Sequence, residues 1–533
     1  MLILGFKPGH DGCVAAVQDR VLLHSLESEK DSGMRHEQLT PSTLLALTEQ
    51  LDGVPDVIAF GGWHRDARLG DTKMGVGYGG IDNVEQRRIN FLGKEVTLFS
   101  SSHERSHLLM SVGMAPRDEF SERVVLTWEG AVGSFYVLDD QYRMTRHVPV
   151  LEWPGWRYGM LFAVADPKFP AEWEMPRHED SGKLMALAAF GDAADADDDV
   201  TALVDGLLEL RRMPFPKRVF KDSPLYNVGV QAEQVKIAAA LLTQRIFRVY
   251  ADAAESELPA GVPLHISGGC GLNCDWNRMW RDLGHFSSVF VPPCTNDAGS
   301  ALGTAIDALG VMTGDPYIDW SVYCGLEFDR DSEPDEATWA KRDMNLAEVA
   351  DALADGRVFA WAQGRYEMGP RALGNRSLLA DPTHAATRDR LNDIKQREGY
   401  RPIAPCCRVE DLGEAFDTDF EDPHMLYFRM VTSPNLAAVT HVDGTARCQT
   451  VSKSDNEVLH QLLTAVGERS GLGVLCNTSL NFKGLGFINR MSDLAKYCEA
   501  HGVDDMVVGD TWYERRDQAP AQPLREREQA GTF

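Results

Sequence analysis

The chain has 533 residues, 44% of them hydrophobic and 25% charged, which is typical of a globular protein too long for a single core. Its formal net charge of −27 argues against a nucleic-acid partner or an anionic membrane surface, because both need a basic face. A run of about eighteen apolar residues is absent from the sequence, and residues 1–12 become polar too quickly for a signal peptide. Ten irregularly spaced cysteines favour buried, reduced thiols, so we expect a cytoplasmic protein of two or three domains.

Two Gly-tipped hairpins are predicted in the first part of the chain. The runs LILGF and CVAAV flank a polar turn that carries His10, and the runs RVVLT and SFYVL flank a turn that carries Glu129. The recurrence of this pattern predicts an internal duplication. Paired hairpins whose tips face one cleft resemble the architecture of actin-like ATPases and sugar kinases, although a single Gly-tipped hairpin is a common element. Between the hairpins, the glycines of residues 66–90 predict a loop.

Residues 100–114 predict a helix that begins near His103 with Ser102 as its cap. His103 and His107 are four residues apart and therefore share one face of the helix, which is the spacing a metal site needs. The letters HERSH also match the HExxH signature of zinc peptidases, in which Glu104 would be the general base. The sequence offers no nearby helix with a third ligand for such an enzyme. A metal or phosphate site and a pair of structural histidines remain the open alternatives.

The next stretch is rich in aromatic residues. Residues 153–180 combine tryptophans with prolines, which predicts an irregular segment that either lines a pocket for a bulky organic substrate or packs within an insertion. Residues 181–191 predict a helix with Ser181 as its cap and Gly191 just past its end. Residues 231–257 predict a long amphipathic core helix.

Two junctions between strand and helix follow, SGGCGLN at 267–273 and PPCTNDAGSALG at 292–303. Glycines at such junctions let a nucleotide or an anion approach the backbone. Asp297 follows a strand end and stands beside a helix start, where it could bind a metal. A plain helix N-cap is the equally open alternative.

The last third of the chain gathers cations against the acidic background. The polar stretch at 325–345 predicts a domain boundary. After it, an apolar run breaks into a Gly-rich loop, and the cations that follow are Arg365, Arg371, Arg376, Lys395, Arg397 and Arg401. Guanidinium groups bind planar oxyanions in pairs, so this stretch predicts a pocket for phosphate or carboxylate oxygens, with a basic surface face as the alternative. Arg447, Asn477 and Ser479 could close the pocket.

Taken together, these motifs resemble one family, the nodulation-type O-carbamoyltransferases, whose members include enzymes that decorate antibiotics. The matching stretches follow one another over nearly the whole chain, so no single motif carries the resemblance. They are GHDG, HERSH, SGKLMALAAFG, SGGCGLN and PPCTNDAGSALG, followed by WAQGRYEMGPRALGNRSLL, KQREGYRPIAP, THVDGTARCQTV and CNTSLN.

The resemblance implies an α/β protein with two domains. Residues 1–340 would form a duplicated actin-like domain, similar to sugar kinases and to the transferase that completes threonylcarbamoyl-adenosine in tRNA. Residues 341–533 would form an α+β domain similar to the synthase that makes the carbamoyl adenylate.

The resemblance also implies a two-step reaction. In the second domain, carbamoyl phosphate and ATP would give carbamoyl-AMP and pyrophosphate, with Lys395 and Arg401 as catalytic residues and Mg²⁺ as a companion of ATP. The positions that match the family's phosphate- and carbamoyl-binding residues are Arg371, Lys395, Arg401, Arg447, Asn477 and Ser479. In the first domain the carbamoyl group would pass to a hydroxyl, with His10 as base or orienter.

A divalent metal is implied for the first domain, iron(II) in relatives. His103, His107 and Asp297 match its ligands. The family has an Asp ligand on the second hairpin, where this chain has Glu129. A Glu still offers a carboxylate oxygen but reaches one methylene further, so this contact is the point at which the chain departs from its family.

Within the family, the stretches FKPGHDG, LTWEG and CNTSLNFKG are most similar to the subgroup that acts on 3-hydroxymethyl cephems. The expected partners are therefore carbamoyl phosphate, ATP and a hydroxylated small-molecule acceptor. Two other classes fit part of the sequence. An actin-like ATPase or binding module without transfer would leave the cations of the second half without a purpose, and a tRNA-modifying enzyme disagrees with the acidic charge.

Overall fold

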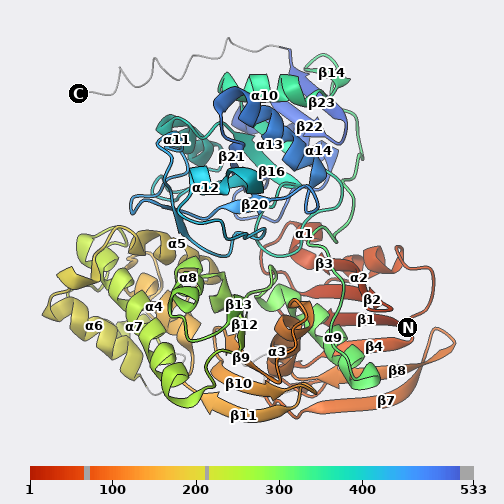
Figure 1. Ribbon diagram of the computed structural model, residues 1–533, viewed down its shortest axis with the longest axis vertical. Coiled ribbons are helices and arrows are strands. Elements are labelled where there is room, and N and C mark those ends of the chain that lie inside the picture. Colours follow the sequence, from red (N-terminus) through yellow and green to blue (C-terminus); the bar gives the residue numbers. More distant parts are fainter. Residues whose placement is uncertain (65–72, 174, 211–214, 517–533) are drawn as a thin grey trace.

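The computed structural model describes residues 1–64, 73–173, 175–210 and 215–516, and its first half repeats one sheet topology (Figure 1). The first sheet has the order β3-β2-β1-β4-β8-β7 and the second has the order β11-β10-β9-β12-β13. In each sheet the first three strands form an antiparallel meander, β1-β2-β3 in one and β9-β10-β11 in the other. The first strand of each meander also pairs in parallel with a later strand, which in turn pairs in parallel with a further one. The repeat confirms the predicted duplication and the actin-like fold of this half.

The strands of these two sheets include both predicted hairpins. β1 pairs with β2 around the turn that carries His10, and β9 pairs with β10 around the turn that carries Glu129. The bounds are β1 (Leu2–Lys7), β2 (Cys13–Gln18), β3 (Val21–Glu27), β4 (Val57–Gly61), β7 (Val84–Phe91), β8 (Lys94–Ser101), β9 (Glu122–Trp128), β10 (Gly133–Asp139), β11 (Met144–Pro149), β12 (Pro263–Ser267) and β13 (Ser288–Phe290).

The Gly-rich stretch at 66–90 is a loop only in part. Its residues up to 72 lie outside the described residues. From residue 73 onward the chain forms β6 (Lys73–Met74), which pairs with β5 (Trp63–His64), and then β7, which pairs along its whole length with β8.

Two helices pack against each other between the sheets, α3 (His103–Met114) after the first sheet and α9 (Ser300–Thr313) after the second (Figure 1). The Ser102 hydroxyl accepts a 3.1 Å hydrogen bond from the Arg105 amide, so the predicted cap is confirmed. Gly303 permits the close crossing, because a Cβ at this position would lie 2.0 Å from the Ser106 carbonyl oxygen. The contact fixes the histidines of α3 relative to the loop that leads into α9.

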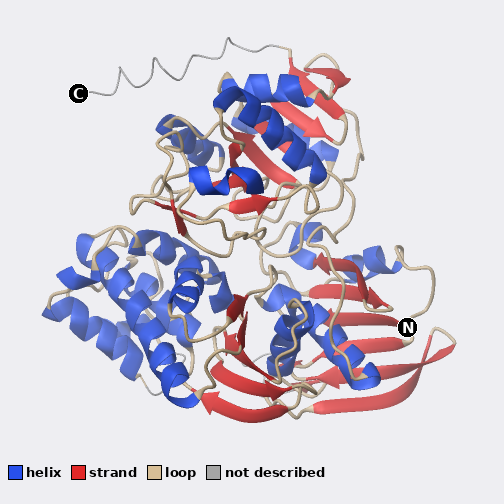
Figure 2. Ribbon diagram, viewed as in Figure 1, coloured by secondary structure: helices blue, strands red, loops and turns tan. Residues whose placement is uncertain are grey.

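A helical insertion covers the second sheet, at the lower left of Figure 2. Its helices lie between β11 and β12 and are α4 (Pro154–Ala165), α5 (His178–Ala188), α6 (Asp198–Glu209) and α7 (Glu233–Glu257). Tyr158 and Leu242 of these helices pack in one core with Trp128 of β9 and with Trp276 of α8 (Cys274–Asp282), the helix between β12 and β13.

The insertion confirms the long helix predicted at 231–257 and corrects two other predictions. The first part of 153–180 is a helix, because Trp153 turns the chain with a left-handed φ of 61° and Pro154 takes the first helical position, where no N–H is needed. Ser181 is not a cap, since α5 already begins at His178.

The second half is built on one sheet of strand order β14-β23-β22-β15-β16-β21-β17-β20. Successive residues of β16 point to opposite faces of this sheet. Leu378 packs with residues of α11 and α14, and Leu379 packs with residues of α10 and α13, so helices cover both faces of the sheet. The strands are β14 (Trp339–Asp343), β15 (Phe359–Ala362), β16 (Arg376–Ala380), β17 (Ala404–Arg408), β20 (Gln449–Val451), β21 (Val474–Ser479), β22 (Asp505–Val508) and β23 (Thr511–Arg515).

The remaining elements of the second half are its helices and one small ribbon. The helices are α10 (Leu346–Ala354), α11 (Ala385–Ile394), α12 (Leu412–Ala415), α13 (Glu457–Ser470) and α14 (Met491–His501), and the ribbon pairs β18 (Arg429–Met430) with β19 (Thr445–Ala446). The domain boundary expected between residues 340 and 341 falls inside β14, the edge strand of this sheet, and that boundary stays a prediction. Tyr427 and Leu426 pack back onto the first half through hydrogen bonds to Val289 and Asn277.

A buried seam joins the two halves. Lys30 of α1 (Ser28–Ser32), just before α2 (Pro41–Thr48), has a side chain only 1% exposed. Its ammonium donates to Glu27 at 2.8 Å and to the carbonyl oxygens of Glu367 and Gly369 at 2.5 and 2.8 Å. The amide of Gly369 donates back to Glu27 at 2.7 Å. The ion pair of the first half is therefore satisfied by backbone groups of the second.

All ten cysteines are free and buried, as predicted. Within the described ranges, we find no helix with the length and apolar character to cross a membrane.

Replacing Lys30 with Met should destabilise the protein by about 3–5 kcal/mol, because Glu27 would stay buried without its cation. The measurement is denaturant unfolding followed by Trp fluorescence. Lys94→Ala is the matched control, since Lys94 is 42% exposed in its ion pair with Asp56, and it should cost about 1 kcal/mol or less. Adding Glu27→Gln to Lys30→Met should recover part of the loss. Equal effects of the two lysine substitutions would contradict the proposed role of the seam.

Candidate active sites

Four buried side chains from separate segments converge beside the second hairpin. On α3, the Nε2 atoms of His103 and His107 lie 3.1 Å apart. Glu129, at the tip between β9 and β10, places Oε2 3.4 Å from His103 Nε2. Asp297 places Oδ1 3.2 Å from His107 Nε2. The N-cap alternative for Asp297 is wrong, because the cap of α9 is Gly299 and the Asp297 carboxylate is engaged elsewhere.

The electrostatics of this cluster fit a divalent metal. Burial opposes the charge on His103, but Asp297 and Glu129 raise its pKa to about 9. Burial likewise opposes ionisation of Asp297, but Lys7 and His103 hold its pKa well below the usual range. The ligand atoms of all four side chains lie within 4.8 Å of one another. Two imidazoles with two carboxylates suit Fe(II) and similar transition metals.

The orientation of His107 supports the same fit. Its Nδ1 lies 3.1 Å from the Ser267 hydroxyl, at the end of β12. A hydrogen bond at Nδ1 fixes the ring so that Nε2 faces the cluster, as in many metal-binding histidines.

Lys7, which the sequence analysis did not single out, ties the first hairpin to this cluster. Its side chain is fully buried, and its ammonium donates to Asp297 Oδ2 at 2.9 Å and to the His10 carbonyl oxygen. It also lies 4.2 Å from the centre of the Trp63 ring. The only signal in the sequence is a lysine directly after the apolar run of β1, which does not reveal burial.

His10 lies between the cluster and a second carboxylate. Its Nε2 is 3.7 Å from Asp297 Oδ2, and its Nδ1 is 2.9 Å from Asp11 Oδ2. The other oxygen of Asp11 is 2.8 Å from His36 Nδ1. Burial opposes ionisation of Asp11, but the bonds to His10 and His36 hold its pKa well below the usual range. Asp11 is therefore a carboxylate acceptor for both histidines.

His178, the first residue of α5, completes this group. Its ring centre lies 5.2 Å from that of His10 and 5.1 Å from that of His36. Burial, followed by the charges of those two histidines, lowers its pKa to about 4. The roles of Asp11, His36 and His178 were not predicted from the sequence. Only Asp11 carried a signal, as a member of the GHDG motif.

Glu104, the candidate general base of a zinc peptidase, has a structural role. Its Oε2 accepts a 2.7 Å hydrogen bond from the Gly80 amide, and its Oε1 accepts one from the Tyr136 hydroxyl. Both oxygens are thus occupied by protein groups, which argues against the peptidase alternative.

The aromatic residues near the His–carboxylate cluster come from positions 63 and 78, not from the predicted aromatic segment at 153–180. Trp63 and Tyr78 lie with ring centres 4.7 and 4.5 Å from that of His103. Burial, followed by the charges of Glu129 and Asp297, raises the pKa of Tyr78 well above its usual range. By contrast, Tyr158 and Phe162 of the predicted aromatic segment lie in the core of the insertion, so that segment is mainly packing.

The residues predicted to bind nucleotide and carbamoyl phosphate gather at one end of the second-half sheet, which we call the cationic chamber. Asn477 and Ser479 are two residues apart on β21 and share a face. Lys395, at the end of α11, donates to the Ser479 carbonyl oxygen and hydroxyl at 2.5 and 3.3 Å and to the Asn481 carbonyl oxygen at 3.1 Å. Arg401 precedes β17, and Arg371 and Arg447 lie on loops beside β16 and β20.

The charges of the chamber repel one another. Burial and then the charge of Arg447 lower the pKa of Arg371 to about 9. Burial, followed by Arg397 and other nearby arginines, lowers the pKa of Lys395 well below its usual range. Arg371 Nε, Arg447 Nε and Asn477 Oδ1 are buried without a partner among the described residues. Buried cations and unpaired polar atoms of this kind need an anion with its own donors, so the chamber is suited to a phosphate ester.

Two of the predicted pocket cations lie elsewhere. The Arg376 guanidinium is fully buried and donates to Asn489 and to the carbonyl oxygens of Gln363 and Gly364. Arg365 donates to the carbonyl oxygens of Gly325 and Cys324. Both arginines hold backbone together, so the prediction of one pocket for all six cations is wrong in these two cases.

One short segment of the first half, residues 33–36, lies near both the cationic chamber and the group around His10. The Gly486 amide donates to the Gly33 carbonyl at 2.9 Å, which fastens the segment to the loop that follows Asn481. Arg35 adds its positive charge to the field that lowers the pKa of Lys395, behind burial and Arg397. The next residue, His36, bonds to Asp11. The two sites therefore meet at consecutive residues of one segment.

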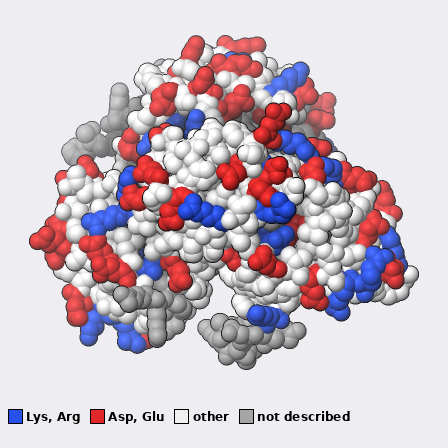
Figure 3. Space-filling model, turned by 60° about the horizontal axis from the view of Figure 1, so that its bottom comes forward, with Lys and Arg blue, Asp and Glu red and all other residues white. Residues whose placement is uncertain are grey.

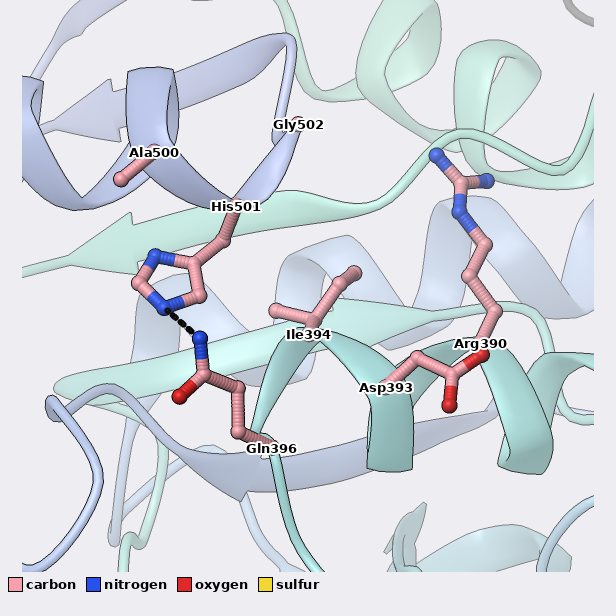
Figure 4. Close-up of a pocket in the computed structure, with 7 residues that line it drawn as sticks. All are labelled: Arg390, Asp393, Ile394, Gln396, Ala500, His501 and Gly502. Atoms are coloured by element: carbon pink, nitrogen blue, oxygen red, sulfur yellow. Dashed lines mark hydrogen bonds between the residues drawn. The ribbon is translucent and has the colours of Figure 1, made fainter.

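Figure 4 shows a surface depression of about 330 Å³ between the ends of α11 and α14. Gln396 and His501 face each other across it at 3.4 Å, while Arg390 points away from them. None of the predicted site residues lines this depression. The side chain of Lys395 instead bonds to Ser479, in the chamber.

Comparison with known proteins identifies the family. The models described as carbamoyltransferase N-terminus and carbamoyltransferase C-terminus match residues 90–306 and 350–515. A 3'-hydroxymethylcephem-O-carbamoyltransferase from Amycolatopsis lactamdurans is 61% identical over 97% of this chain and 100% of its own, and one from Streptomyces clavuligerus is 59% identical over 97% and 99%. A nodulation protein U from Bradyrhizobium diazoefficiens is 29% identical over 94% and 95%. Because such similarity spans both halves, the chain belongs to the carbamoyltransferase family.

Proposed function

We propose that the chain transfers a carbamoyl group from carbamoyl phosphate, by way of carbamoyl-AMP, to the hydroxyl of a 3'-hydroxymethyl cephem. The observation that carries the proposal is the full-length similarity, at 61% and 59% identity, to two proteins named for that acceptor. The cationic chamber and the His–carboxylate cluster support the two chemical steps.

The first step belongs to the chamber. Water would cleave carbamoyl phosphate to phosphate and carbamate, and a carbamate oxygen would then attack the α-phosphorus of ATP and displace pyrophosphate. Arg371, Arg401 and Arg447 would hold phosphate oxygens, with Mg²⁺ accompanying ATP. Lys395 would stabilise the charge that develops at the α-phosphate. Asn477 Oδ1, which has no partner among the described residues, would accept a bond from the carbamoyl NH₂ group.

The second step belongs to the first half. His10 Nε2 would take the proton of the acceptor hydroxyl while Asp11 accepts the Nδ1 proton of the same ring. The hydroxyl oxygen then attacks the carbamoyl carbon and AMP leaves. His103, His107, Glu129 and Asp297 would hold a divalent metal, which we infer to be iron(II), and this ion would supply Lewis-acid stabilisation of the charge on oxygen.

The charge distribution favours a small acceptor over tRNA. On the face shown in Figure 3, Lys and Arg lie scattered among Asp and Glu rather than in one broad basic patch. With a net charge of −27, such a surface offers little for counterion release from a nucleic-acid backbone.

The acceptor is tested directly by mass spectrometry. With ATP, Mg²⁺, Fe(II) and ¹³C-labelled carbamoyl phosphate, a 3'-hydroxymethyl cephem should gain one labelled carbamoyl group at the hydroxyl. The matching 3'-methyl cephem, which has no hydroxyl, is the control and should gain none. Formation of pyrophosphate without any labelled cephem would contradict the proposed acceptor while leaving the first step in place.

The two sites should separate by mutation. Lys395→Ala or Arg401→Ala should reduce pyrophosphate release by about 10²-fold or more, because each removes a positive charge from the developing phosphate charge. His10→Asn should leave pyrophosphate release nearly unchanged and stop transfer. The two products are measured in parallel. Equal loss of both products in His10→Asn would contradict the division of labour.

Binding of the phosphate ligand should be linked to proton uptake. Because burial and neighbouring cations lower the pKa of Lys395, part of the free protein carries it neutral at alkaline pH, and an anion beside it restores the pKa. Affinity for a non-hydrolysable ATP analogue should therefore be highest below the lowered pKa and fall as pH rises through it. Calorimetry in buffers of different ionisation enthalpy measures the uptake, which Lys395→Met should diminish. Unchanged uptake in Lys395→Met would assign the proton to another group.

A further inference from the structure

The two carboxylate oxygens of Glu129 have different partners. Oε2 faces the two histidines of the proposed metal site, 3.4 Å from His103 Nε2 and 3.5 Å from His107 Nε2. Oε1 accepts a 2.8 Å hydrogen bond from the Tyr78 hydroxyl. Glu129 is 3% exposed, so this hydroxyl is a protein substitute for water at Oε1.

The position of Tyr78 is fixed by the helix that carries the two histidines. Its carbonyl oxygen accepts a 3.0 Å hydrogen bond from the Glu104 amide, in the first turn of α3. Two residues later, the Gly80 amide donates to the Glu104 carboxylate at 2.7 Å, and the Gly80 carbonyl accepts from the Ser102 hydroxyl at 2.8 Å. The segment of Tyr78 is thus fastened to the N-terminus of α3, which fixes the Tyr78 hydroxyl relative to His103 and His107.

We propose that Tyr78 is a positioning residue of the metal centre: its hydroxyl holds Oε1 of Glu129 so that this carboxylate offers the metal Oε2 alone. The inference rests on the proposed metal centre and extends it to a residue outside the four ligands. A carboxylate at residue 129 shortened by one methylene withdraws by up to about 1.5 Å and cannot reach both the cluster and Tyr78.

The first test is metal affinity of the full-length protein, with Co(II) as the probe and a competing chelator as the reference. Tyr78→Phe removes the hydroxyl and leaves the ring beside His103. It should weaken Co(II) binding about 10–100-fold, as loss of such a partner does at other metal sites. The visible absorption of bound Co(II) should also change, because the released Oε1 can join the coordination sphere and raise the coordination number.

Tyr136→Phe is the matched control. It removes a buried hydroxyl that bonds to a carboxylate of the same helix, Glu104, but not to a ligand of the cluster. It should leave both Co(II) affinity and the spectrum unchanged. The same affinity loss in both variants would show that any buried hydroxyl near α3 has this effect, and it would overturn the assignment of Tyr78.

A double-mutant cycle gives the sharper test. In a Glu129→Asp background the hydroxyl has no carboxylate to hold, so adding Tyr78→Phe should change Co(II) affinity less than twofold. An undiminished effect in that background would overturn the proposal, as would Tyr78→Phe with wild-type affinity and spectrum. If the wild-type protein itself binds no Co(II), the metal centre fails and the role of Tyr78 with it. If the wild-type protein binds Co(II) and Tyr78→Phe binds it equally well, the metal centre is retained and only the role of Tyr78 is rejected.

Discussion

Asp297 lies where the first hairpin, the second hairpin and the start of α9 meet, and its buried carboxylate needs positive or proton-bearing neighbours from each side. Lys7 supplies one from β1 and His107 supplies another from α3, while His10 Nε2 lies 3.7 Å away. An ionised carboxylate in this position is costly unless all of these groups are in place. The duplicated sheets and the close crossing of α3 and α9 can therefore be understood as the frame that brings them together. Without Lys7 and His107, the Asp297 carboxylate would be buried with no partner closer than His10 Nε2.

The second half shows the opposite imbalance. Its chamber holds arginines and a lysine whose pKa values are lowered by burial and then by mutual repulsion, and within the described residues several polar atoms of the chamber find no partner. A protein tolerates such a set where a ligand supplies the missing charge. The seam at Lys30 and the segment with Arg35 and His36 connect the half that contains this cation-rich site to the half that contains the carboxylate-rich site. The charge that each half lacks is thus available in the substrates and metal it is proposed to bind.

The sequence predicted the parts of the fold that depend on local pattern and motif. The hairpins around His10 and Glu129, the capped helix of His103 and the long α7 follow from turn residues and periodicity. Burial and long-range contacts could not be predicted in this way. The roles of Lys7 and Tyr78 could not be predicted because they depend on partners far away in the chain. Arg365 and Arg376 looked like ligand-binding cations, yet they bond to backbone, since spacing does not reveal which way a side chain points.

Charge also gives the proposed reaction a direction. In the proposed first step, ATP and carbamoyl phosphate would bring several phosphate groups to the chamber, where they would offset the repulsion among Arg371, Lys395 and Arg401. After pyrophosphate leaves, the adenylate would retain a single phosphate, so the chamber would hold it less strongly than the substrates. The same cations that favour its formation therefore do not trap it. At the other site, Asp297 and Glu129 would repel an anionic intermediate unless Lys7 and a bound metal offset their charge. In the proposed reaction, arrival of the adenylate would therefore depend on how completely the charges of Asp297 and Glu129 are offset.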